Sequence, residues 1–100
     1  MAALVEQAAL FKTALGRGDF KYVHDYSYYF QGLAQAFFSR LNETQKERLR
    51  ASFGELSGLI EQLDLASGRR HQEATQTTID HLQSLLKQID GQVHGRNPNK

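Results

Sequence analysis

The sequence contains no cysteine and no tryptophan, and its only proline, Pro98, is the third residue from the end. The lack of cysteine excludes disulfide bonds and thiolate sites, and it fits a reducing compartment. A chain without internal proline and with few β-branched residues favours helix throughout its length. One hundred residues are enough for one domain, and a hydrophobic content of 40% is compatible with a packed core.

Long apolar runs and an excess of one charge are missing as well. No stretch approaches the ~20 apolar residues of a membrane span. The N-terminal sequence MAALVEQAALFK lacks the basic region and the long apolar run of a signal peptide. Twelve basic and 11 acidic side chains give a formal net charge of +1, so the chain has no long-range attraction for nucleic acid. We therefore expect a cytoplasmic protein with no membrane partner.

No pattern of residues indicates catalysis or metal binding. The serines occur without a G-x-S-x-G motif, and the acidic residues are dispersed rather than paired. The histidines form neither an H-x-x-x-H nor an E-x-x-H pattern, and we expect all four to be solvated surface residues: His24, His71, His81 and His94. The sequence therefore predicts a protein that is not an enzyme and has no cofactor and no metal.

The stretch from Phe20 to Phe38 holds eight of the ten aromatic residues. Its apolar residues recur with the i, i+3, i+4, i+7 spacing of an amphipathic helix, with a core stripe that includes Val23, Phe30 and Phe37. Tyr26 falls on the same side of the predicted helix as this stripe. The apolar arc covers roughly half of the helix circumference, whereas one core requires a stripe of only ~100°. Either two neighbouring helices cover this arc, or part of it is a binding face.

Three further segments have helical periodicity. Residues 2–15 place four apolar side chains on one face, and two longer stripes follow the aromatic stretch. The stretch 69–78 is polar nearly all round, so we expect it to protrude from the bundle or to be poorly covered. The stripes are Leu4, Ala8, Phe11 and Leu15, then Leu49, Phe53, Leu56, Ile60 and Leu63, and last Thr75, Thr78, Leu82, Leu85 and Ile89.

The breaks between these segments are less well defined. Residues 16–19, GRGD, either end one helix and start another at an Asp19 N-cap, or lie within one long helix that is continuous or kinked. A seven-residue spacing that continues across them favours the single continuous or kinked helix. Asn42 or Thr44 can cap the next helix, and Thr44 with Glu47 fits a capping box. Gly68 marks a kink or a stutter, with a loop as the open alternative.

These segments predict an all-α fold, an up-and-down antiparallel helical bundle or a long helical hairpin. A bare hairpin buries too little surface, so we expect either three or four helices or completion of a four-helix bundle by dimerisation. Residues 1–90 form the single helical domain. Residues 91–100 contain only turn and coil residues, and we expect them to form a flexible tail.

Three segments resemble the small flagellar export chaperones of the FliT and FlgN type: ALGRGDF at 14–20, LIEQLD at 59–64 followed by Arg69-Arg70, and residues 82–89. The similarity extends over roughly residues 5–90. It implies a helical protein that holds the amphipathic terminal helix of a secreted client until export. In that family the last helix helps to bind the client, which implies an apolar contact at Leu82, Leu85, Leu86 and Ile89, with Tyr22 and Tyr29 at the rim.

The residues themselves also indicate protein binding. Tyr22, Tyr28 and Tyr29 are amphipathic side chains of the kind enriched at interfaces. The expected function is a non-enzymatic secretion-type chaperone or adaptor, and the alternative is a structural or regulatory homodimer. A nucleic-acid-binding regulator is disfavoured, because glutamates are interspersed with the basic residues and the aromatic residues are not.

Overall fold

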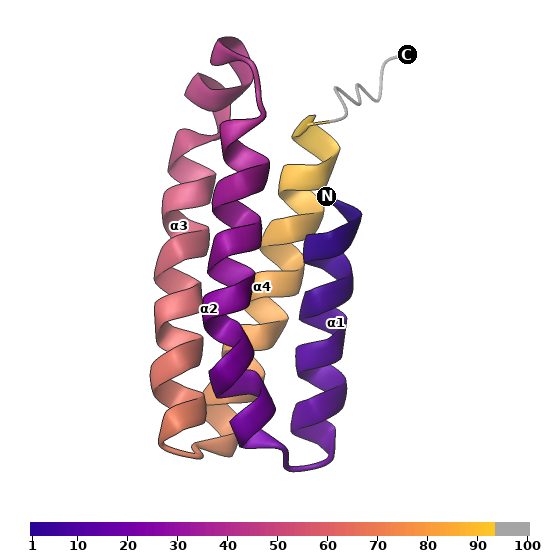
Figure 1. Cartoon of the computed structure of the whole chain (residues 1–100), viewed down its shortest axis with the longest axis vertical. Coiled ribbons are helices and arrows are strands. Elements are labelled where there is room, and N and C mark those ends of the chain that lie inside the picture. Colours follow the sequence, from indigo (N-terminus) through magenta and orange to yellow (C-terminus); the bar gives the residue numbers. More distant parts are fainter. Residues whose placement is uncertain (94–100) are drawn as a thin grey trace.

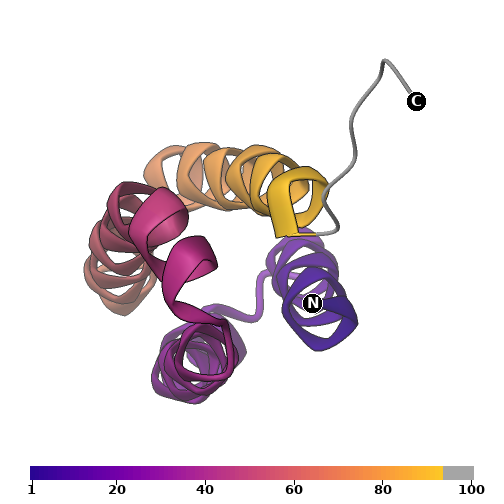
Figure 2. The same ribbon diagram turned by 90° about the horizontal axis from the view of Figure 1, so that it is seen from above.

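The computed structural model describes residues 1–93, of which 89% are helical. They form four antiparallel helices, α1 (Ala2–Gly16), α2 (Phe20–Ser39), α3 (Glu43–Gly68) and α4 (Gln72–Val93), in an up-and-down bundle (Figure 1). Within the described residues the helices form a ring in which each is adjacent to two others, with α1 beside α4, and the backbones of the diagonal pairs make no close approach (Figure 2). The predicted all-α bundle is therefore confirmed, and a single chain supplies all four helices.

All four helices contribute to one core. Phe11 of α1 meets Phe30 of α2 edge to face, with ring centroids 5.6 Å apart. The core stripe expected for the aromatic stretch is confirmed for Val23 and Phe30, whereas Phe37 is only partly buried. The buried apolar side chains are Leu4, Ala8, Phe11, Ala14, Leu15, Val23, Phe30, Ala34, Leu49, Phe53, Leu56, Leu59, Ile60, Leu63, Ile79, Leu82, Leu85, Leu86 and Ile89.

The first connection is a loop, so the favoured single continuous or kinked helix is wrong. Gly18 has φ +73°, and its N–H donates to the carbonyl of Leu15 at 2.9 Å, while Asp19 N–H donates to Ala14 at 2.9 Å. These two bonds form a Schellman motif, which glycine favours because the left-handed conformation costs it little. The Asp19 carboxylate then accepts from Tyr22 N–H at 3.1 Å and caps α2.

The second connection places the cap of α3 at Asn42. Its side chain accepts from Gln45 N–H at 2.8 Å, and the Gln45 side chain accepts in return from Asn42 N–H at 3.2 Å. Asn42 was one of the two expected caps, but the capping box of Thr44 with Glu47 is wrong, because α3 begins at Glu43, one residue before Thr44.

Between α3 and α4 the chain turns sharply at residues 69–71, so the break at Gly68 is a loop, and the expected kink or stutter is wrong. The stretch 69–78, expected to protrude or to be poorly covered, is instead packed from Thr75 onward. Thr75 and Thr78 are buried, and their hydroxyls donate to the carbonyls of His71 at 2.6 Å and Ala74 at 2.8 Å. Helix α4 continues through 91–93, so the expected tail does not begin at residue 91, and its remainder lies outside the described residues.

Candidate protein-binding surface

The apolar side chains of α4 that were expected to contact a client lie inside the bundle. Leu82, Leu85, Leu86 and Ile89 are at most 4% exposed, and they pack in the core with the other three helices. The client contact that the resemblance implies at these residues stays a prediction, and the closed bundle gives a client no direct access to them. Their periodicity marks a buried face whose partners belong to the same chain, and a client could reach it only after α4 had left the bundle.

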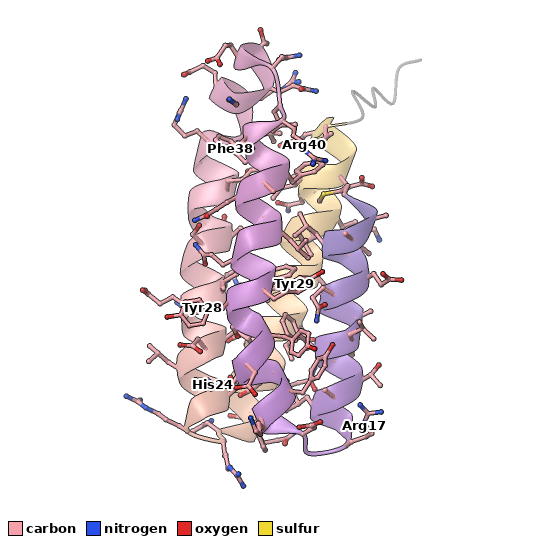
Figure 3. The ribbon with its side chains drawn as sticks, viewed as in Figure 1. Arg17, His24, Tyr28, Tyr29, Phe38 and Arg40 are labelled. Atoms are coloured by element: carbon pink, nitrogen blue, oxygen red, sulfur yellow. The ribbon has the colours of Figure 1, made fainter. Side chains whose placement is uncertain are left out.

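The three tyrosines selected from the sequence do not share one surface. Tyr29 lies on the flank of α2 that faces α1, and Tyr28 lies on the flank toward α3 (Figure 3). Tyr22 is on the same flank as Tyr29, since its ring meets Phe11 of α1. Tyr28 and Tyr29 are 82% and 54% exposed, whereas Tyr22 is only partly exposed. Consecutive helical residues diverge by about 100°, and this rotation separates Tyr28 from Tyr29.

A row of aromatic rings follows the seam between α1 and α2. Tyr22 meets Phe11 edge to face at 6.3 Å and stacks on Tyr26 at 4.4 Å, and Tyr26 meets Tyr29 edge to face at 5.8 Å. Gln7 Nε2 of α1 donates to Tyr22 Oη at 3.2 Å, which fixes the inner end of the row. The rings are therefore held in place by one another and by α1.

The three tyrosine rings of this row line a surface depression of about 570 Å³, the tyrosine groove, formed by Gln7, Leu10, Tyr22, Asp25, Tyr26 and Tyr29. Leu10 and Tyr26 are 44% and 41% exposed, so apolar surface remains open on both walls. Exposed apolar patches of this kind commonly mark interaction sites. Tyr26 was expected on the apolar side of its helix without a binding role, and Leu10 was not expected to take part in binding. The available signal was spacing, because Tyr26 follows Tyr22 by four residues and precedes Tyr29 by three, which places the three rings side by side on a helix.

The charge at the edge of the groove is largely compensated. Lys21 Nζ contacts Asp25 Oδ2 at 2.6 Å, one helical turn away. This hydrogen bond, with the attraction of the same carboxylate, raises the pKa of Lys21, to which Asp19 also contributes. Asp25 therefore presents little free negative charge to a ligand in the groove, whose walls are otherwise uncharged.

Two histidines expected to be merely solvated form pairs between helices. His24 Nδ1 of α2 lies 2.9 Å from Asp64 Oδ1 of α3, and His81 Nε2 of α4 lies 3.2 Å from Glu55 Oε2 of α3. His71 Nδ1 accepts from Ala74 N–H at 3.2 Å, at the start of α4. Sequence spacing could not reveal the partners of His24 and His81, which lie on other helices.

The described part of the chain has no group of three or more side chains suited to hold a metal ion. Among residues 1–93, no helix combines the length and the apolar character needed to cross a membrane. Comparison of the chain with protein-family models, with curated proteins and with solved structures gave no significant match.

Proposed function

We propose that the protein is a non-catalytic binding module of the secretion-chaperone type, which holds an amphipathic helix of a client protein along the tyrosine groove. The observation that carries the proposal is the exposure of Leu10, Tyr26 and Tyr29 in one groove, next to a core that is otherwise closed. The resemblance to export chaperones implies a contact through α4. Because that face of α4 is buried, we place the client contact at the α1–α2 seam instead. Tyr22 and Tyr29 remain part of the proposed contact.

A helix is the segment that fits such a seam best. Two antiparallel helices form a groove between them, and an amphipathic helix fills a groove of this kind with apolar residues at i, i+3, i+4 and i+7. Tyrosine supplies a large contact area with few rotatable bonds, and it is enriched among residues that dominate binding energy. The mutual packing of Tyr22, Tyr26 and Tyr29 reduces the cost of ordering them on binding.

The test uses fluorescently labelled amphipathic helical peptides that contain no arginine or lysine, with anisotropy as the readout. Tyr29→Asp should lower peptide affinity at least tenfold, because it places a charge in the apolar groove. Tyr28→Asp is the matched control, since it makes the same change one residue away on the opposite flank of α2, and it should leave the affinity unchanged. Circular dichroism should show both variants folded.

Three outcomes would contradict the proposal. One is that no amphipathic peptide binds the wild-type protein. The second is that Tyr28→Asp weakens binding as much as Tyr29→Asp does. The third is a homodimer that light scattering detects, that Tyr29→Asp dissociates, and that binds no peptide, which would assign the groove to self-association instead.

A further inference from the structure

A second depression lies on the other flank of α2, between α2 and α3. Its volume is about 340 Å³, and its lining residues are Ser27, Tyr28, Gln31, Ser57, Gly58, Ile60, Glu61 and Asp64. We call it the α2–α3 pocket. Ser27 and Ile60 are buried and form its floor, and Gly58 leaves space where a side chain would otherwise stand.

The walls of the α2–α3 pocket combine an aromatic ring with negative charge. Tyr28 is the most exposed large apolar residue of the described chain, at 82%, and it has no ring partner there. Glu61 is exposed and forms no ion pair within residues 1–93. No lysine or arginine lines the pocket. It therefore presents a free aromatic face and an uncompensated carboxylate in one hollow.

His24 holds one of the lining residues of the pocket, Asp64, in place. Its Nδ1 lies 2.9 Å from Asp64 Oδ1 and 3.1 Å from the Asp64 carbonyl oxygen, and both atoms are acceptors, so Nδ1 carries the hydrogen. The pair holds the Asp64 carboxylate in place beside the pocket. Of the two acidic side chains, Glu61 is thus the one available to a ligand, and Asp64, which His24 already contacts, adds a negative potential.

We propose that the α2–α3 pocket binds the guanidinium group of an arginine side chain from the protein partner. This inference rests on the proposed function only for the existence of a protein partner, and it adds what that partner must carry. A guanidinium is planar, stacks on aromatic faces, and donates two parallel N–H bonds to a carboxylate. Tyr28 supplies the face, Glu61 supplies the carboxylate, and Gln31 and Ser57 supply further acceptors.

An ammonium group suits the pocket less well. Lysine carries a compact, strongly hydrated charge that cannot make the bidentate, stacked contact. The absence of basic side chains from the lining means that a cation entering the pocket meets no repulsion from lysine or arginine. The chemistry therefore selects arginine over lysine, and both over a neutral side chain of the same shape.

The test is a titration of the isotope-labelled full chain with N-acetyl-arginine methylamide at low salt, followed by NMR. Saturable shifts should appear at the Tyr28 ring and the Gly58 amide. Glu61→Gln and Tyr28→Leu should each weaken binding about two- to fivefold, as expected for exposed ion pairs and cation–π contacts. Tyr29→Leu is the matched control on the other flank, and it should leave the affinity unchanged.

The citrulline analogue has nearly the same shape as the arginine probe without its charge, so it should not bind, and the lysine analogue should bind more weakly. The proposal is wrong if citrulline binds equally, if Glu61→Gln has no effect, or if no saturable shift appears at the pocket. The peptides that test the tyrosine groove contain no arginine. Failure at the α2–α3 pocket and failure at the groove are therefore separate results.

Discussion

The imidazole of His24 in α2 lies against Gly68, the last residue of α3. A Cβ atom on residue 68 would come within 3.2 Å of both Cε1 and Nδ1 of that ring, which is tighter than ordinary packing. The ring cannot withdraw freely, because Asp64 holds its Nδ1 at 2.9 Å. Gly68 is helical, so close approach of the ring, rather than an unusual backbone angle, accounts for glycine there.

This contact predicts that Gly68→Ala and His24→Ala change the free energy of unfolding non-additively. Alanine is favoured over glycine within helices by about 1 kcal/mol, but in Gly68→Ala the crowding of His24 should cancel most of that gain. In a His24→Ala background the gain should reappear. Urea unfolding of the four proteins should give a coupling energy of about 0.5–1 kcal/mol. Gly54→Ala, which has open space around its Cβ, should stabilise both backgrounds equally. Additive effects at residues 24 and 68 would contradict the described contact.

Arg70 predicts a stabilising substitution. It has φ +55°, a left-handed conformation that side chains with a Cβ rarely adopt, and its N–H donates to Ser67 in a second Schellman motif. Arg70→Gly should therefore raise the free energy of unfolding by about 0.5–1 kcal/mol, measured by thermal or urea denaturation. Arg69→Gly is the control, because φ at residue 69 is −90° and no strain is relieved there. Equal effects at the two positions would refute this account of the turn.

The burial of α4 predicts which leucines maintain the fold. Leu86→Ala should lower the free energy of unfolding by about 2–5 kcal/mol, because it empties a fully packed site. Leu65→Ala removes the same atoms from a side chain that is 54% exposed, and it should change stability by no more than about 0.5 kcal/mol. If the two variants were equally stable, α4 would not be packed as described, and its apolar face would again be available to a client.

The pair of Lys21 with Asp25 predicts a titration at high pH. The hydrogen bond from Lys21 to Asp25 is the largest cause of its raised pKa, so Asp25→Asn should lower the pKa toward its ordinary value of 10.5. Because the folded-state pKa is raised, any stabilisation by the pair is fully present at neutral pH and is lost as the pH rises through that pKa. NMR titration of the Lys21 side chain measures this directly. An unchanged pKa in Asp25→Asn would show that the pair does not form in solution.

Periodicity predicted the elements that depend on one helix alone. The all-α fold, the core positions Val23 and Phe30 and the cap at Asn42 follow from local spacing and from residue chemistry. The break at Gly18 was mispredicted, because the seven-residue spacing continues across it by coincidence. That spacing contains no information on the two hydrogen bonds of the Schellman motif, which offset the cost of ending the helix.

Contacts between helices could not be predicted in this way. The apolar face of α4 has the same pattern whether its own chain or a client covers it, and only the number of helices in the bundle decides which. His24 and Asp64 are 40 residues apart, and no spacing rule relates them. For the tyrosines, the sequence indicated that α2 has more aromatic surface than one neighbour covers. It could not show that α1 lies beside Tyr22, Tyr26 and Tyr29 while α3 lies beside Tyr28.

Helices α1 and α4 complete the ring as neighbours without any loop between them, and Lys12 Nζ lies 3.6 Å from Asp80 Oδ1 across their seam. The start of α1 and the end of α4 lie toward the same end of the bundle (Figure 1). The packing therefore does not depend on which helix comes first. A circularly permuted chain, with α4 linked to α1 and new ends in the loop at Gly18, should assemble the same four-helix bundle.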